Sequence, residues 1–219
     1  MKKTFLFLAL CSSTVSYAQS SKYHKAIEQN LALLDTVKTE AGYRKVGSTF
    51  ERIATAEKTQ WLAYYYASYC AIRAVRFERD LNMIDARLDQ AEILTHQAST
   101  LNPNNSEIYC LNALIAFYRI NVDFMARGPE YSAIANEALH KAKILDPSNP
   151  RAYLLLGESK YSTPEQFGGD KKLACQLFDK AFTLFNEAPA TGIAPHWGKA
   201  DVTRYHGICH AQASAATTK

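Results

Sequence analysis

Two nearly identical stretches indicate the fold: LNPNN at residues 101–105 and LDPSN at residues 145–149, which lie 44 residues apart. Before each proline, apolar residues recur in steps of four and three, the spacing of an amphipathic helix. A third run with the same steps follows. The three runs are Ile84, Leu88, Ala91, Thr95 and Ala98; Tyr131, Ala135, Ala138, Ala142 and Leu145; and Ala174, Phe178, Ala181 and Phe185. These steps predict one narrow apolar stripe on each helix, with alanines that let a neighbouring helix approach closely.

The runs resemble the tetratricopeptide repeat, in which helix pairs stack side by side. The matching positions are Ala135, Leu139, Ala142 and Pro147 in a second helix, Tyr153, Leu156 and Gly157 in a first helix, and Trp61 and Tyr109 at the start of two others. Tyr65 and Ala113 stand where glycine is usual, and the bulk of Tyr65 argues against a close helix approach there. The period exceeds the family's 34 residues. The extra residues lie around 79–85, 123–130 and 164–170, and they lengthen the helices or form loops. Pro129, Pro164 and the pair Gly168-Gly169 favour loops in the last two segments.

Other parts of the chain complete the predicted array. Residues 23–38 and 43–57 form another helix pair in this interpretation, and residues 197–213 form a final helix. A helix pair cannot bury its apolar face alone, so the pairs must stack and the end helices act as caps. We therefore expect one all-α domain over residues 19–219, a tetratricopeptide-like solenoid of about four helix pairs plus a C-terminal helix.

A closer resemblance extends over nearly the whole of that domain. The motifs are FERIA at 50–54, WLAYYY at 61–66, ARG at 126–128, TPEQFGG at 163–169 and PHWG at 195–198. They resemble a group of exported tetratricopeptide proteins from Bacteroidetes. That group has no assigned biochemical activity, so the resemblance implies export and fold but no ligand.

The N-terminus has the three parts of a secretory signal peptide. Lys2 and Lys3 precede an apolar run, residues 5–10, and a small-x-small site ends at Ala18. We expect cleavage after Ala18 and release of a soluble protein into the periplasm. Cys11 lies in a lipobox-like context, but Leu10 occupies the position where a small residue is required, which disfavours a lipoprotein. No later apolar stretch is long enough to span a bilayer.

Charge excludes one class of partner. Without residues 1–18 the formal net charge falls from +4 to +2, and the remaining lysines and arginines form no basic block. Nucleic-acid binding requires such a clustered basic footprint. We therefore expect no nucleic-acid partner.

Four cysteines remain after removal of the signal peptide, namely Cys70, Cys110, Cys175 and Cys209. None of their spacings is a metal or redox motif. Most fall among apolar residues of predicted helices, so we expect buried free thiols. If a disulfide exists, the pairing Cys175–Cys209 is favoured, because it would tie down the last helix.

The sequence offers weak candidates for chemistry. His206 and His210 share a helix face, as in metal sites, but no carboxylate is spaced to join them and Cys209 points elsewhere, so no metal site and no cofactor are expected. The turn at residues 167–170 resembles a phosphate loop, but Asp170 would repel an anion, and we expect it to cap the next helix instead. No catalytic triad or carboxylate pair stands out, and the chain is not expected to be an enzyme.

Aromatic residues recur at equivalent positions of the predicted first helices. In tetratricopeptide arrays these helices line a concave groove. The candidate groove residues are Tyr66, Tyr69, Phe117, Tyr118, Glu158 and Tyr161. Tyrosine combines apolar area with a hydrogen-bonding tip, which suits peptides and glycans. The alternative is that the same rings fill the core between the helices.

These observations favour a scaffold that binds a protein or peptide partner in an aromatic-lined groove. The second hypothesis is a receptor for a small ligand such as a peptide or glycan, with the segments Arg127-Gly128 and 167–169 closing one end of the groove. An enzyme of unknown class is the third. An enclosed pocket with converging polar groups would favour the receptor over the scaffold.

Overall fold

The structure, a computed structural model, describes residues 21–217, and every regular element among them is helical. Residues 21–34 are helical and are followed by α2 (Glu40–Ala56), α3 (Trp61–Val75), α4 (Leu81–Leu101), α5 (Ser106–Ile120), α6 (Phe124–Leu145), α7 (Pro150–Ser162), the short 3-10 helix η1 (Glu165–Phe167), α8 (Lys171–Glu187) and α9 (Lys199–Thr217). The predicted all-helical array is confirmed. The proposed signal peptide lies outside the described residues.

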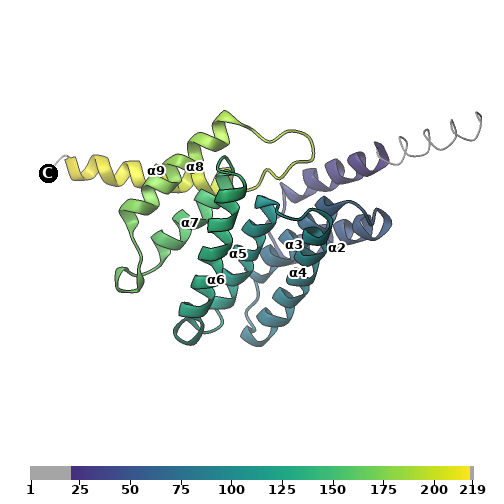
Figure 1. Ribbon diagram of the computed structural model, residues 1–219, viewed down its shortest axis with the longest axis horizontal. Helices are drawn as coiled ribbons and strands as arrows, with labels where there is room; N and C mark the ends of the chain where they lie inside the picture. The colour runs from purple at the N-terminus through teal and green to yellow at the C-terminus, as the bar shows by residue number, and fades with distance from the viewer. Residues whose placement is uncertain (1–20, 218–219) are drawn as a thin grey trace, which may run out of the picture.

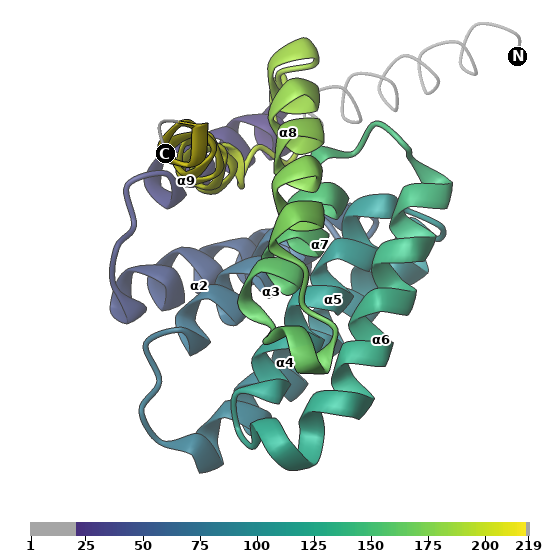
Figure 2. The ribbon, with the colours of Figure 1, turned by 90° about the vertical axis from the view of Figure 1, so that its left-hand side faces the viewer.

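The helices pack as consecutive antiparallel hairpins, which form a curved stack in Figures 1 and 2. The pairs α3 with α4, α5 with α6, and α7 with α8 share extensive contacts, and α2 packs on α3. Helix α5 contacts both α3 and α7. These three helices therefore form one continuous layer, which we call the concave layer. Among residues 21–217, no helix is long and apolar enough to cross a membrane.

Short polar side chains start the helices. Asn105 and Asn149, from the two repeated stretches, accept hydrogen bonds from the backbone amides of Glu107 and Arg151. Amides in the first turn of a helix have no partner within the helix, so these side chains satisfy them. Asp170 accepts from the amide of Leu173, as predicted. The repeat in the sequence is thus a repeated helix-start signal.

The prediction of a loop around Pro129 is wrong. Pro129 lies inside α6, and most of the extra repeat length is in α4 and α6, which have 21 and 22 residues. A proline within a helix removes one backbone hydrogen bond. The first turn is nevertheless held, because Asp123 caps the amide of Ala126 and Arg127 forms an ion pair with Asp85 of α4 at 2.8 Å. Around Pro164 the predicted loop is present, with Gly168 at a φ of 91°.

One close helix approach depends on a glycine at the expected repeat position. A Cβ atom on Gly157 of α7 would lie 2.5 Å and 2.7 Å from two ring carbons of Phe178 on α8. Phe178 is fully buried, so its ring has little room to move. At the equivalent position of α3 the chain has Tyr65 instead of glycine, and its ring is fully buried between the helices.

We therefore predict that Gly157→Ala lowers the free energy of unfolding by about 1–3 kcal/mol through overpacking against Phe178. The matched control is Gly207→Ala in α9, where an added Cβ meets no atom within 4 Å. That change should be neutral or stabilising by up to about 1 kcal/mol, because alanine favours helix. Urea unfolding of both variants checks this. Equal effects would show that α7 and α8 are less closely packed.

Candidate functional site

The six predicted groove residues lie on the concave layer, two each on α3, α5 and α7. Their exposure differs from that of an open groove. Tyr66 is 1% exposed and Tyr69 is 6% exposed, so these two rings are core residues. Phe117, Tyr118, Glu158 and Tyr161 are partly buried. The sequence placed the residues on the expected helices but could not show what covers them.

The covering element is the segment between α8 and α9, residues 193–198. Figure 1 shows the chain after α8 reaching across to the N-terminal helix before it turns back into α9. The Tyr66 hydroxyl donates to the carbonyl of Ile193 at 2.9 Å. The Trp197 ring stacks on Tyr69, with ring centroids 5.0 Å apart. His196 contacts Asp35 after the N-terminal helix at 2.8 Å. The segment thus spans the concave layer.

The two segments predicted to close the groove do not take this role. Arg127 and Gly128 are part of α6, and Phe167 packs edge-on against Phe124 at the start of that helix, with centroids 5.9 Å apart. The groove is covered instead by residues 193–198.

A buried polar network joins the covering segment to the concave layer. Arg151 of α7, only 5% exposed, forms an ion pair with Glu107 of α5 at 2.9 Å. Its second terminal nitrogen donates to the carbonyl of Pro195, and its guanidinium lies over the Trp197 ring. Tyr65 donates to Glu107 at 2.9 Å and accepts from the Trp197 indole at 2.7 Å. The network therefore joins α3, α5, α7 and the covering segment.

Electrostatics in the network follow from its burial. Burial raises the pKa of Glu107, while Arg151 and the hydrogen bond from Tyr65 act in the opposite direction. Burial is the largest single influence on Arg151 and lowers its pKa, but Glu107 together with Tyr65, Cys110 and Tyr66 raises the pKa of this guanidinium overall. Removal of Arg151 would leave the Glu107 carboxyl group buried without its partner, and removal of Glu107 would leave the Arg151 charge buried in the same way.

A cavity of about 200 Å³ lies beside the covering segment. Its walls come from the end of the N-terminal helix, the start of α2, helix α3 and the start of α9. They include Leu34, Val37, Tyr43, Tyr66, Tyr69, His196, Trp197 and Asp201. Tyr118 of α5 and Glu158 of α7 interact electrostatically with the lining residues Tyr43 and Asp201, respectively. We call the cavity, together with Tyr118, Glu158 and the arginines that act on Glu158 (Arg73, Arg76 and Arg204), the concave cleft. It combines aromatic walls with polar groups at one edge.

Three arginines lie near enough to Glu158 of the concave cleft to act on it electrostatically. Arg73, Arg76 and Arg204 all act electrostatically on Glu158, which is also repelled by Asp201. Burial is the main cause that raises the pKa of Glu158 to about 7, and Asp201 adds to the rise. Burial likewise raises the pKa of Tyr118, against the influence of Arg73 and Arg76. With Glu158 protonated, the edge carries more positive than negative charge.

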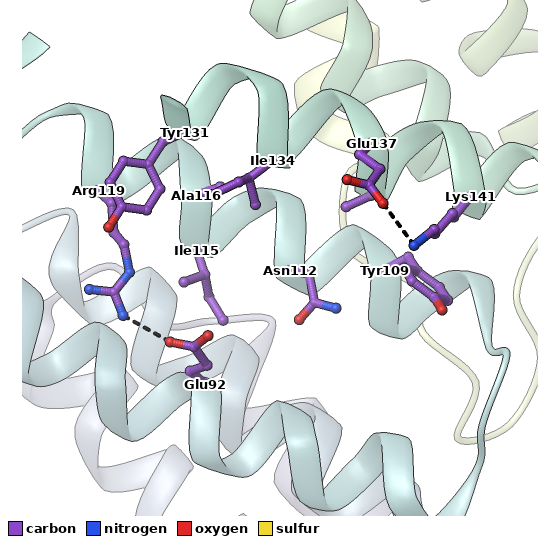
Figure 3. Close-up of a pocket in the computed structure, with 11 residues that line it drawn as sticks. Glu92, Tyr109, Asn112, Ile115, Ala116, Arg119, Tyr131, Ile134, Glu137 and Lys141 are labelled. Atoms are coloured by element: carbon purple, nitrogen blue, oxygen red, sulfur yellow. Dashed lines mark hydrogen bonds and ion pairs between the residues drawn. The ribbon is translucent and has the colours of Figure 1, made fainter. Parts of the chain in front are cut away.

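A second cavity, of about 330 Å³, lies on the other side of α5, between α4 and α6. Figure 3 shows its lining residues, among them Tyr109, Asn112 and Tyr131. Its charged groups already have partners. Arg119 pairs with Asp85, Asp89 and Glu92, and Lys141 pairs with Glu137. A charged ligand would have to break these pairs, so this cavity is the weaker candidate site.

The structure corrects two expectations about the C-terminal helices. The expectation of free thiols is wrong for Cys175 and Cys209, which form the favoured disulfide pairing and link α8 to α9. It is confirmed for Cys70 and Cys110, which are buried free thiols. The expectation that no carboxylate accompanies the histidine pair is wrong. Asp179 of α8 lies 3.6 Å from Nε2 of His206 and 3.1 Å from Nε2 of His210. Sequence spacing could not reveal this, because Asp179 lies on another helix.

Fold and cleft together define an array of helical hairpins with a small aromatic-lined cavity on its concave side. The sequence matches no protein-family model and no curated protein. The tetratricopeptide assignment therefore stays a resemblance.

Among solved structures, the chain is similar to the HusA haemophore from Porphyromonas gingivalis, a member of the Bacteroidetes. The TM-score is 0.80 and the sequence identity 32%, over 87% of this chain and 94% of the haemophore. The chain belongs to the same family as that haemophore. The neighbour is a binding protein rather than an enzyme.

The buried network makes a specific prediction. Arg151→Ala should lower the free energy of unfolding by about 3–5 kcal/mol, because Glu107 is left buried without its partner. The double variant Arg151→Met with Glu107→Met should recover most of that loss. Lys141→Ala, which removes an exposed ion pair, should leave it nearly unchanged. Urea unfolding measures all three, and a small effect of Arg151→Ala would contradict the role of the network.

Proposed function

We propose that the mature protein is an exported carrier that binds haem, or a closely related tetrapyrrole, in the concave cleft. The observation that carries the ligand class is the similarity to a haemophore along nearly its whole length. The predicted signal peptide supports a function outside the cytoplasm. The placement in the concave cleft rests on the chemistry of the residues found there.

A tetrapyrrole presents two flat apolar faces, which aromatic side chains contact well. In the concave cleft Trp197 is fixed by its stack on Tyr69 and by its hydrogen bond to Tyr65. Tyr118 on α5 is partly exposed and lies near Tyr43 of the cavity wall. A rigid, partly exposed aromatic wall of this kind provides binding area without the entropy cost of ordering flexible side chains.

The same ligand carries two carboxylates on one edge, and these need cations or hydrogen-bond donors. Arg73, Arg76 and Arg204 lie at the polar edge of the concave cleft. Arginine forms two parallel hydrogen bonds with a carboxylate, which makes it well suited to this task. The aromatic wall and the arginine edge therefore match the two parts of the ligand.

Cavity size adds a constraint. Pockets that hold drug-sized ligands usually measure about 300–1,000 Å³, whereas the cavity in the concave cleft measures about 200 Å³. The ring would therefore extend over the partly exposed residues of α5 and α7, with one edge in water. A carrier that must hand over its cargo benefits from such an accessible edge.

The scaffold hypothesis is less well supported by these contacts. An extended peptide in the groove would need the surface that residues 193–198 already cover. The small-ligand receptor fits better, with haem in place of the peptide or glycan that the aromatic residues suggested. The covering segment then forms one wall of the site.

An absorbance titration with haem tests the proposal. Tyr118→Ala and Arg73→Gln should each weaken binding by roughly tenfold or more, because they remove the aromatic wall and a carboxylate partner. The matched controls are Tyr131→Ala and Arg119→Gln, the corresponding residue types in the second cavity. Those two should leave the dissociation constant within about twofold. The reverse pattern would move the site to the second cavity, and no binding at all would refute the function.

Glu158 should make binding depend on pH. Its pKa of about 7 means that the carboxyl group is neutral below pH 7 and leaves the arginines free to attract an anion. As the pH rises through 7, Glu158 ionises and competes for them. Affinity for haem should therefore fall between pH 6 and pH 8, by roughly three- to tenfold for one proton.

The variant Glu158→Gln is the control for this effect, because glutamine keeps the shape but does not ionise. The ratio of dissociation constants at the two pH values should be close to one after correction for haem aggregation. A wild-type ratio equal to that of Glu158→Gln would show that this carboxyl group does not act on the ligand.

A further inference from the structure

Three potential metal ligands meet between the last two helices. His206 and His210 project from successive turns of α9, and Asp179 projects from α8. One ligand atom from each residue lies within 4.8 Å of the other two. The side chains remain accessible, at 49% exposure for Asp179, 28% for His206 and 59% for His210. An ion could reach this cluster directly from solvent.

The separations suit a first-row transition metal. Ligand atoms bound tetrahedrally at about 2.0–2.1 Å from Zn²⁺ lie about 3.3 Å from one another. Both histidine Nε2 atoms point at the same oxygen of Asp179, at 3.1 Å and 3.6 Å. An ion between the three groups would need only small movements of side chains. Two neutral imidazoles and one carboxylate are also the ligand types that zinc accepts.

The cluster is held by neighbouring structure. The disulfide joins Cys175, one turn before Asp179, to Cys209, which directly precedes His210. It therefore fixes α8 and α9 relative to each other at the level of the cluster. The His206 ring also stacks on Phe182 of α8, with centroids 4.1 Å apart. These contacts reduce the entropy cost of bringing ligands from two helices around one ion.

We propose that Asp179, His206 and His210 form a site for a divalent transition metal ion, with Zn²⁺ as the preferred ion and water in the remaining position. Three protein ligands with one open position are typical of zinc sites that keep an exchangeable ligand. The site is separate from the haem proposal, since it uses none of the residues assigned to the concave cleft.

Isothermal titration of the oxidised, haem-free mature protein with ZnCl₂ tests this site. One equivalent of zinc should bind with a dissociation constant in the micromolar range or below. His206→Ala, His210→Ala and Asp179→Asn should each weaken it by roughly tenfold or more, since even an outer-shell partner contributes that much. Circular dichroism should show unchanged helix content, because all three residues are accessible to solvent.

Matched controls separate this site from other histidines. His96→Ala on α4 and His140→Ala on α6 remove exposed histidines and should leave zinc affinity unchanged. His196→Ala removes the other histidine that contacts an aspartate and should also have no effect. Absence of zinc binding, or binding that survives the cluster variants and is lost in His196→Ala, would overturn the proposal.

The disulfide provides a second test. The double variant Cys175→Ser with Cys209→Ser keeps all three ligands but removes the covalent link between α8 and α9. Zinc affinity should fall by roughly three- to tenfold as the site loses its fixed geometry. Unchanged affinity in this variant would refute the part of the proposal that assigns preorganisation to the disulfide. Because no haem is used, failure here is distinct from failure of the proposed carrier function.

Discussion

The ion pair between Arg151 and Glu107 is the contact on which the concave side depends. It joins two neighbouring helices of the layer, and the same guanidinium holds the carbonyl of Pro195. An uncharged side chain could fill the space but could not bind a carboxylate, a carbonyl oxygen and an aromatic face together. The pair therefore positions a segment that has no regular structure of its own. Together with the contacts of Tyr66 and Tyr69, it keeps the covering segment against the concave layer.

The cleft arises because a stack of hairpins has a concave face and the chain returns to it. After α8 the chain leaves the stack and reaches the end of the N-terminal helix, where His196 contacts Asp35. It then enters α9. Trp197 is fixed there by stacking and hydrogen bonding, so it presents a rigid ring. Around it, charge is distributed unevenly, with arginines at one edge and a single carboxyl group of raised pKa among them. Rigid aromatic surface and localised positive charge together suit a flat ligand with acidic groups.

Sequence periodicity was sufficient for the helix pairs because their packing uses local repeats. Alanines in steps of four and three, and Gly157 against Phe178, require no knowledge of distant contacts. Pro129 misled the prediction because a cap and an ion pair from another helix compensate for the lost hydrogen bond. The covering segment lacks any periodicity, and its contact with Tyr66 spans 127 residues of chain. Asp179 joins His206 and His210 only through the packing of two helices.

The proposed carrier function requires the ligand to lie against the covering segment in the concave cleft. The chain has only two tryptophans, Trp61 at the start of α3 and Trp197 in the cleft. Their indole N–H signals are separate probes in a ¹⁵N-labelled sample. On addition of iron-free, diamagnetic protoporphyrin, the ring current should shift or broaden the Trp197 signal strongly and the Trp61 signal little, because Trp61 lies two turns before Tyr69 on the helix. A saturable shift of Trp61 alone, or of neither signal while the ligand is bound, would contradict the account.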